Sequence, residues 1–247
     1  VAMGLVDTLM VGPLGPEAIG AVGIGSAVFI GIAIFGMGVL LGLDTLVSQA
    51  YGAGRIDDCH RWLVHGAVLS LGVAVPVTLL LFLLTSLLDR WGLDPTVHLL
   101  TRPYLDVVVW SVLPLLLYAT FRRYLQGMGI VRPVMIALVS ANLVNVLVNW
   151  VLIYGKLGAP AMGVRGAAWA TVLSRVMMAG YLFVVILQRE RGRRPGLFET
   201  SLAIDPAWMR RLLALGVPAA SQLTLEVGVF AAATALASPG SMRPPGK

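Results

Sequence analysis

The sequence is poor in charged residues and has almost no cysteine. Charged side chains make up 12% of its 247 residues and hydrophobic side chains 58%, whereas an average soluble domain carries about 25% charge. The single cysteine, Cys59, excludes a disulfide within the chain. The three histidines, His60, His65 and His98, are too scattered to suggest a metal site. The composition therefore argues against a soluble domain and against a small fold stabilised by disulfides or zinc.

Sequence signatures of common enzymes are also missing. The chain contains no G-x-S-x-G, no H-E-x-x-H and no Walker motif, so we expect neither hydrolase chemistry nor hydrolysis of ATP. An intramembrane aspartyl protease would need two Asp residues on facing helices, and only Asp7 is a candidate. We therefore expect a protein that is not an enzyme and that needs no cofactor.

Long uncharged runs dominate what is present. Residues 18–43, 66–88 and 133–155 are each long enough to cross a hydrocarbon core of about 30 Å as a helix. The mean hydropathy of the whole chain is +0.87. The sequence predicts an all-α polytopic membrane protein.

The runs and the Gly and Pro residues between them predict six helices and a seventh that follows. The expected helices cover residues 1–12, 18–50, 63–88, 99–125, 134–154, 167–188 and 212–237. Residues 51–62 are expected to form a polar loop. Pro114 should kink the fourth helix, and Gly38 and Gly42 form a GxxxG pair that suits close helix packing.

These helices divide the chain into four parts. We expect a six-helix membrane lobe, a cytoplasmic inter-lobe loop, the first helix of a second lobe and an atypical tail. Their bounds are 1–190, 191–211, 212–237 and 238–247.

Basic residues are distributed unevenly between alternate loops. The loops after the even-numbered helices hold Arg55, Arg61, Arg122, Arg123, Arg132, Arg189, Arg191, Arg193, Arg194, Arg210 and Arg211. The loops on the other side hold Arg90, Arg102, Lys156 and Arg165. By the positive-inside rule, the first set and the N-terminus should be cytoplasmic.

The segment NLVNVLVNWVLIY, residues 142–154, places three amides in an apolar run. Asn142, Asn145 and Asn149 are spaced i, i+3 and i+7, within roughly 60° of one another on one helix face. An amide facing lipid would have no hydrogen-bond partner, so this face should meet protein or a hydrated cavity. Packing between helices and a polar site both fit the pattern.

Asp7, in the apolar segment GLVDTLMVG, is the charged partner that a polar site would need. A carboxylate within a membrane helix is costly unless it is paired, protonated or hydrated. The alternative is an Asp at a helix end that reaches the interface. We favour a functional Asp7 that accepts a proton or, with amide oxygens nearby, holds Na⁺.

Other charged residues within apolar stretches have plainer interpretations. Glu226, in TLEVGVF, is interpreted as a proton site or a counter-ion for a cationic ligand, with a structural hydrogen bond as the alternative. Arg175 is expected to snorkel or to pair locally. Asp44 and Asp106 lie near helix ends and are expected to be solvated.

Several segments together resemble the multidrug and toxic compound extrusion (MATE) family of transporters. The resemblance rests on the order and spacing of these segments and extends from residue 1 to about 237. The segments are GLVDTLMVG around Asp7, LVSQAYGAG at 46–54, RRYLQGMGIVRP at 122–133, NVLVNWVLIYG at 145–155, GVRGAAWATVLS at 163–174 and GVPAASQLTLEVGVF at 216–230.

The resemblance implies a secondary active antiporter in the cell membrane. Such proteins export cationic or amphipathic drugs and toxins in exchange for Na⁺ or H⁺, through a cavity between two six-helix lobes. Carried over by position, Asp7, Asn145, Asn149 and Thr171 would form the cation or proton site of the N-terminal lobe. Some members have an Asp where this chain has Asn149, so the site has one charge fewer here. Glu226 falls on the family's acidic position in helix 7.

The resemblance also implies that the chain is an N-terminal lobe whose partner is a missing C-terminal lobe. Two alternatives to the antiporter stay open. One is a flippase for lipid-linked precursors from the same superfamily, which usually has a strongly cationic cavity. The other is a non-functional truncated membrane fragment, which the tail SPGSMRPPGK suggests.

Overall fold

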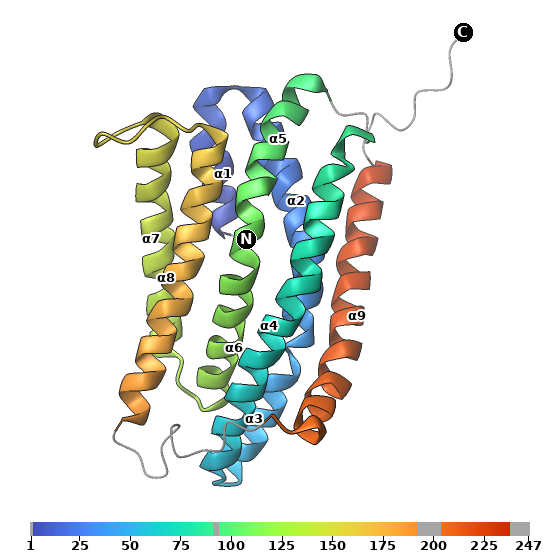
Figure 1. Ribbon diagram of the computed structural model, residues 1–247, viewed down its shortest axis with the longest axis vertical. Helices are drawn as coiled ribbons and strands as arrows, with labels where there is room; N and C mark the ends of the chain where they lie inside the picture. The colour runs from blue at the N-terminus through green and yellow to red at the C-terminus, as the bar shows by residue number, and fades with distance from the viewer. Residues whose placement is uncertain (1, 91–93, 192–203, 238–247) are drawn as a thin grey trace.

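The computed structural model describes residues 2–90, 94–191 and 204–237, and within them the chain is a bundle of long helices (Figure 1). The α-helices are α1 (Ala2–Val11), α2 (Pro16–Val39), α3 (Gly42–Gly52), α4 (Ile56–Ser86), α5 (Pro95–Val108), α6 (Val112–Gly127), α7 (Arg132–Tyr154), α8 (Val164–Glu190) and α9 (Pro206–Ala237). Short 3₁₀ turns lie at η1 (Gly12–Leu14), η2 (Leu88–Arg90) and η3 (Val109–Ser111).

Six described helical segments are long and apolar enough to cross a membrane. They cover Pro16–Gly52, Ile56–Ser86, Pro95–Gly127, Arg132–Tyr154, Val164–Glu190 and Pro206–Phe230. The prediction of an all-α polytopic membrane protein is confirmed.

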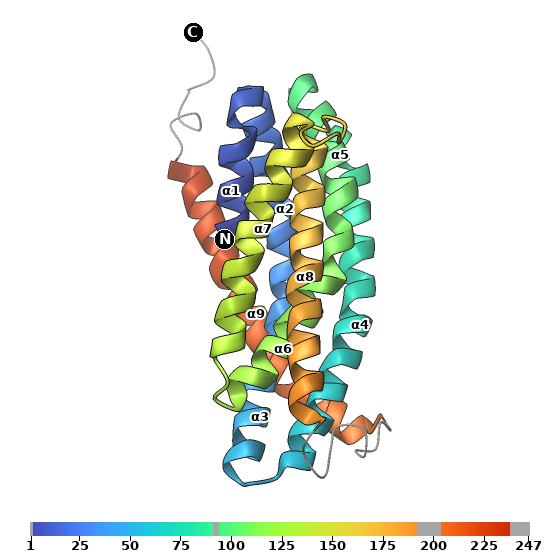
Figure 2. The same cartoon turned by 90° about the vertical axis from the view of Figure 1, so that its left-hand side faces the viewer.

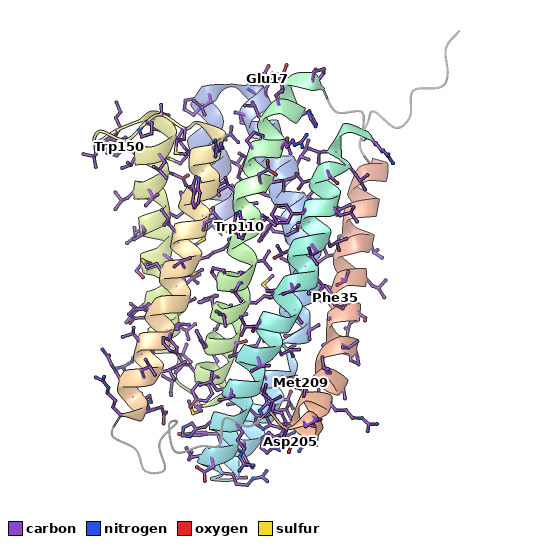
Figure 3. The ribbon with its side chains drawn as sticks, viewed as in Figure 1. Glu17, Phe35, Trp110, Trp150, Asp205 and Met209 are labelled. Carbon is purple, nitrogen blue, oxygen red and sulfur yellow. The ribbon has the colours of Figure 1, made fainter. Side chains whose placement is uncertain are left out.

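The helices run roughly parallel to the long axis, so their connections gather at two ends (Figures 1 and 2). Figure 3 labels Glu17 at one end and Asp205 at the other. We call these the Glu17 end and the Asp205 end. The loops after the even-numbered predicted helices lie at the Asp205 end, and the alternate loops lie at the Glu17 end. The fold thus places the strongly basic loops and the weakly basic loops at opposite ends.

Local sequence explains where several helices begin and end. Pro16 occupies the first turn of α2, where its missing N–H costs nothing, and Glu17 follows it near the positive end of the helix dipole. Asp94 caps α5 by accepting a hydrogen bond from the backbone N–H of Thr96 at 2.9 Å. Gly155 ends α7 with a φ of 68°, which glycine adopts without a steric penalty.

The expected polar loop at residues 51–62 is wrong over most of its length. α4 begins at Ile56, and Cys59, His60 and Trp62 are buried. Polar residues in this stretch find partners within the protein, so they are compatible with a packed helix. The last helix likewise begins six residues before the predicted position, at Pro206. Most of the expected inter-lobe loop and all of the expected tail lie outside the described residues.

Two helices that were predicted to be continuous are interrupted. The expected helix at 18–50 is divided at Leu40–Leu41 into α2 and α3. The expected helix at 99–125 is divided by η3, one turn before Pro114. Proline clashes with the carbonyl four residues earlier and cannot donate to it, so the irregularity falls upstream of Pro114.

Small residues bring α9 close to α2 and α3. A Cβ atom at Gly216 would lie 1.9 Å from the carbonyl oxygen of Val39, and one at Gly38 would lie 2.5 Å from the Cα of Ala220. Gly42 is also against α9, where an added Cβ would meet the carbonyl oxygen of Leu212 at 3.1 Å. The close packing predicted for the Gly38 and Gly42 pair is confirmed, and Gly38 meets another small residue, Ala220.

Substituting alanine for Gly216 should therefore loosen α9. The new methyl group would overlap backbone rather than a flexible side chain, and overpacking of this kind costs about 1–3 kcal/mol. We expect a lower midpoint of thermal unfolding in detergent for Gly216→Ala. Gly228→Ala on the same helix meets nothing within 4 Å and should leave the midpoint unchanged. Equal midpoints for the two variants would contradict this packing.

Candidate functional site

The carboxylate of Asp7 lies inside the bundle, in contact with α7 and α8. Asp7 is only 1% exposed to solvent. Asn149 of α7 donates its side-chain N–H to Asp7 Oδ1 at 2.8 Å. Thr171 of α8 donates its hydroxyl to Asp7 Oδ2 at 2.5 Å. Each carboxylate oxygen therefore has a neutral donor from a different helix.

Asn145 completes this group, which we call the Asp7 site (Asp7, Asn145, Asn149 and Thr171). Asn149 Nδ2 also lies 3.2 Å from Asn145 Oδ1, one turn earlier on α7. Both amides are fully buried. Asn145 Nδ2 and Asn149 Oδ1 have no hydrogen-bond partner, although buried amide atoms are normally paired. The site thus holds hydrogen-bonding capacity that the protein itself does not use.

Close packing of three helices brings these side chains together. A Cβ atom at Gly166 would lie 2.7 Å from the carbonyl carbon of Leu152, so α7 and α8 touch backbone to backbone just before Thr171. α1 is tied to the end of α7 by the Tyr154 hydroxyl, which donates to the Met10 carbonyl at 2.6 Å. Sequence neighbours of the site therefore fix its geometry.

Asn142 does not belong to the Asp7 site. Its side-chain N–H donates to the Leu138 carbonyl of its own helix at 2.7 Å, and the residue is only partly buried. Asn142 lies about 60° from Asn145 around the helix and about 10 Å from Asn149 along its axis. The predicted stripe of three amides is therefore a buried pair, Asn145 and Asn149, with Asn142 at its edge.

Arg175 lies one turn beyond Thr171 on α8, and of the two expected arrangements it pairs locally instead of snorkelling. Its Nη1 donates to the hydroxyl of Ser111 at 2.5 Å. Its guanidinium carbon lies 4.4 Å from the centre of the Phe29 ring, a cation–π distance. It is also close enough to Asp7 and Tyr104 to interact electrostatically with both. The side chain is thus held within the bundle.

Tyr104 lines the same interior and was not anticipated from the sequence. The ring packs against Gly25, where a Cβ atom would lie only 2.5 Å from it, and the hydroxyl lies 3.0 Å from Ser26 Oγ. No sequence pattern marks Tyr104 or Ser111, because both meet their partners across helices. Arg175 alone carried a signal, since it follows Thr171 by four residues and so shares its helix face.

Glu226 is not brought to the Asp7 site. It is exposed on α9, a helix that packs against α2, α3 and α4. Asp44, expected to be solvated, instead pairs with Arg123 of α6 and keeps 43% of its side chain exposed. Asp106 is exposed, as expected.

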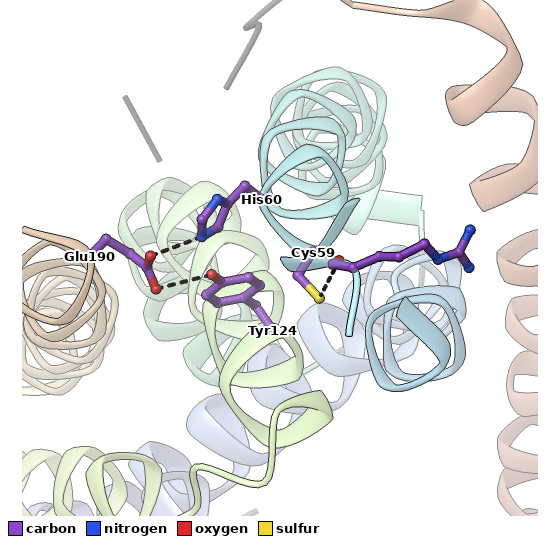
Figure 4. Close-up of polar contacts among 5 residues, drawn as sticks. Cys59, His60, Tyr124 and Glu190 are labelled. Carbon is purple, nitrogen blue, oxygen red and sulfur yellow. Dashed lines mark hydrogen bonds and ion pairs between the residues drawn. The ribbon is translucent and has the colours of Figure 1, made fainter. Parts of the chain in front are cut away.

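Figure 4 shows a second buried polar cluster, which contains His60, Tyr124 and Glu190. His60 Nε2 lies 2.8 Å from Glu190 Oε2, and both side chains are at most 1% exposed. The Tyr124 hydroxyl lies 3.5 Å from Glu190 Oε1. Beside it, Cys59 Sγ contacts the Arg55 carbonyl at 3.6 Å. This cluster joins α4, α6 and α8 and is separate in sequence and in contacts from Asp7.

The side chains of the Asp7 site are suited to bind a small hard cation or a proton. It offers carboxylate, amide and hydroxyl oxygens, the ligand types that such cations prefer. The unpaired Oδ1 of Asn149 is an acceptor that a cation would occupy. A neutral, protonated Asp7 would likewise fit a dry interior.

Comparison with known proteins agrees with this architecture. A profile of the MatE family matches residues 1–151. The chain belongs to the MatE family. Its members are membrane transporters and not enzymes, so this is a multi-pass protein of a drug-efflux family.

Curated relatives of the MatE chain carry the name multidrug resistance protein NorM. The protein from Photobacterium profundum is 32% identical over 238 residues, which cover 96% of this chain and 52% of that protein. A probable NorM from Synechocystis is 31% identical and is covered over 50% of its length. The chain therefore spans about half the length of the curated relatives it matches.

Solved structures show the same relation. A MATE crystal structure in the bent conformation has a TM-score of 0.81 at 26% identity, and the match covers 92% of this chain and 50% of that one. A superfamily transporter from Pyrococcus furiosus, described as having a binding pocket of reverse polarity, has a TM-score of 0.78 at 27% identity, with 92% and 50% covered.

Removing the Thr171 hydroxyl should destabilise the lobe. Thr171→Val would leave a buried carboxylate oxygen without its donor, at a cost of about 1–3 kcal/mol. We expect a lower unfolding midpoint in detergent at neutral pH. Ser174→Ala is the matched control, because the Ser174 hydroxyl bonds only to the Ala170 carbonyl of its own helix. If the midpoint falls as far for Ser174→Ala, the hydrogen bond from Thr171 to Asp7 contributes no more to stability than a hydroxyl bonded within its own helix.

Proposed function

We propose that the chain is the N-terminal lobe of a cation-coupled exporter of amphipathic organic compounds, including organic cations. The observation that supports this most is the buried Asp7 carboxylate, which receives donors from Asn149 and Thr171 within an apolar bundle. Ionisable residues buried in membrane helices are costly and usually mark an ion pathway or a coupling site. The multidrug resistance relatives support the export of drugs.

In this proposal the export cycle needs a second lobe. Alternating access generally works by movement of two repeats around a shared site, and the chain spans about half of its relatives. Residues 1–190 would form one lobe, residues 191–211 the link and residues 212–237 the first helix of the next lobe. Glu226 would then face the second lobe, since it is exposed on α9 in this chain.

Coupling would act through the Asp7 site. A proton or Na⁺ bound there can drive the cycle only if it binds one conformation more tightly than the other. Asp7 contacts residues on α7 and α8, so a change in the tilt of α1 would alter every oxygen distance in the site. The ion would thereby favour the conformation in which α1, α7 and α8 are packed together.

The basic Asp205 end would be cytoplasmic. Its helix ends and loops carry most of the described arginines, including Arg55, Arg122 and Arg210, whereas the Glu17 end carries Arg90, Arg102, Lys156 and Arg165. This bias supports the proposed orientation by the positive-inside rule, and the cell membrane is the location that the family resemblance implies.

The flippase alternative receives less support. Binding of a pyrophosphate headgroup needs several interior cations. Across the described helices, Arg175 is the basic residue that lies mid-span, far from either end. One guanidinium is a poor match for two phosphates.

Asp7→Asn should abolish ion-driven dye efflux by the complete gene product in cells. The amide keeps the size of the side chain but cannot take up a proton or balance the charge of Na⁺. Membrane insertion and expression level should be unchanged, and Asp106→Asn at an exposed position serves as the control. Efflux that persists in Asp7→Asn would exclude the proposed coupling role.

Asn149→Asp should shift the coupling toward Na⁺. It restores the second carboxylate that the resemblance assigns to some members and places it against Asp7, where Asn149 now bonds at 2.8 Å. Two carboxylates attract a cation more strongly than one. We expect a larger Na⁺-induced rise in the unfolding midpoint than in the parent protein, with K⁺ as the comparison salt. No difference between the two proteins would mean that the site does not hold Na⁺.

A further inference from the structure

Arg175 lies deep within the membrane-spanning part of α8, where burying a charge is energetically costly. Its side chain cannot reach water by extending along the helix. It lies eleven residues after the start of α8 and fifteen before its end, which is about 17 Å and about 22 Å along the axis. Both distances exceed the length of the side chain. The cost of an interior guanidinium must therefore be offset by local partners or by a ligand.

The protein satisfies only part of the guanidinium. A guanidinium has five N–H donors, and within the described residues the hydrogen bond of Arg175 is the one to Ser111. Ser111 in turn donates to the Val108 carbonyl at 2.5 Å, so its position is fixed. Arg175 remains partly exposed. Donors are thus left available on a cation that is held in one orientation.

Asp7 does not take up these donors. Its two oxygens accept from Asn149 and Thr171, and within the described chain no ion pair joins Asp7 to Arg175. The two charges share one interior without contact. A carboxylate that accepts from two neutral donors and a cation with spare donors are suited to different partners.

We propose that Arg175 is a specificity-determining residue that binds the acidic group of an amphipathic substrate. This inference rests on the proposed function, and it specifies that the amphipathic substrates include compounds that carry a carboxylate, zwitterions among them. The planar fork of a guanidinium matches a carboxylate with two parallel hydrogen bonds. Phe29 lies under the guanidinium at 4.4 Å and keeps its plane fixed.

The surroundings hold the guanidinium in a fixed position. Phe29 and Tyr104 are aromatic, and both are nearly fully buried against the lobe. Ser26 and Gly25 hold the Tyr104 ring in place. An acidic group would therefore meet a cation whose position is already fixed, so the protein would lose little conformational entropy on binding.

The test compares three probes with the same ring system and different charge: 2-naphthoate, 2-naphthamide and 2-naphthylmethylamine. Binding to the purified complete gene product is measured by equilibrium dialysis. We expect naphthoate to bind more tightly than naphthamide. Arg175→Gln should weaken naphthoate by about tenfold or more, the effect of losing a charge-assisted bond, and leave naphthamide unchanged. Arg165→Gln, at an exposed position on the same helix, should change neither.

Arg175→Lys separates charge from geometry and covers the case in which the Gln variant fails to fold. It keeps the charge but loses the fork, so naphthoate binding should fall between the parent and Arg175→Gln. Equal binding of naphthoate and naphthamide by the parent protein would overturn the inference. So would an equal loss of all three probes in a folded Arg175→Gln, because that result would make Arg175 a structural counter-ion.

These outcomes are independent of the proposed function. If naphthoate binding depends on Arg175 but dye efflux is unaffected by Asp7→Asn, the inference about Arg175 holds and the coupling role of Asp7 is excluded. Efflux that requires Asp7, together with indifference to the acidic probe, would do the reverse.

Discussion

Burial of the Asp7 carboxylate is the constraint on which the rest of this lobe depends. A carboxylate in an apolar interior is tolerated only when it is bonded, protonated or bound to a cation. Its two oxygens are served by Asn149 and Thr171, which come from different helices. α1, α7 and α8 must therefore meet at fixed distances, and Gly166 permits that by letting α7 and α8 touch. The hydrogen bonds to Asp7 therefore require the same close packing of the three helices that the small residues allow.

The same interior contains a second charge that the first does not neutralise. Arg175 is anchored by Ser111 and stacked on Phe29, so it is positioned as firmly as Asp7. Two opposite charges held apart cost more than an ion pair, because each is desolvated without full compensation. An arrangement of this kind is explained more readily by ligands that complete each charge than by stability. A coupling ion at Asp7 and an acidic group at Arg175 are the matching partners.

Contacts that depend on spacing within one helix could be predicted from the sequence. Contacts between residues on different helices could not. Asn145 and Asn149 could be paired with each other from their i, i+4 spacing, and Asp7 was conspicuous because its segment is apolar. The family resemblance added Thr171. Residues 56–62 looked like a loop because they are polar, but His60 is paired with Glu190, 130 positions away, inside the bundle. Ser111 and Tyr104 contact Arg175 and Ser26 across helices, and no periodicity within one segment encodes such contacts.

α2 contacts both the polar interior of the lobe and α9. One of its faces carries Phe29 and Ser26, which hold Arg175 and Tyr104 in place. Further along, Gly38 contacts Ala220 of α9 so closely that the helices cannot slide past each other without separating. α1, which carries Asp7, also packs on α2. A change of charge at Asp7 or Arg175 that tilts α2 would therefore move α9, the helix that we propose begins the second lobe. A rigid helix with tight contacts on both sides provides a physical route between an ion site and a distant lobe.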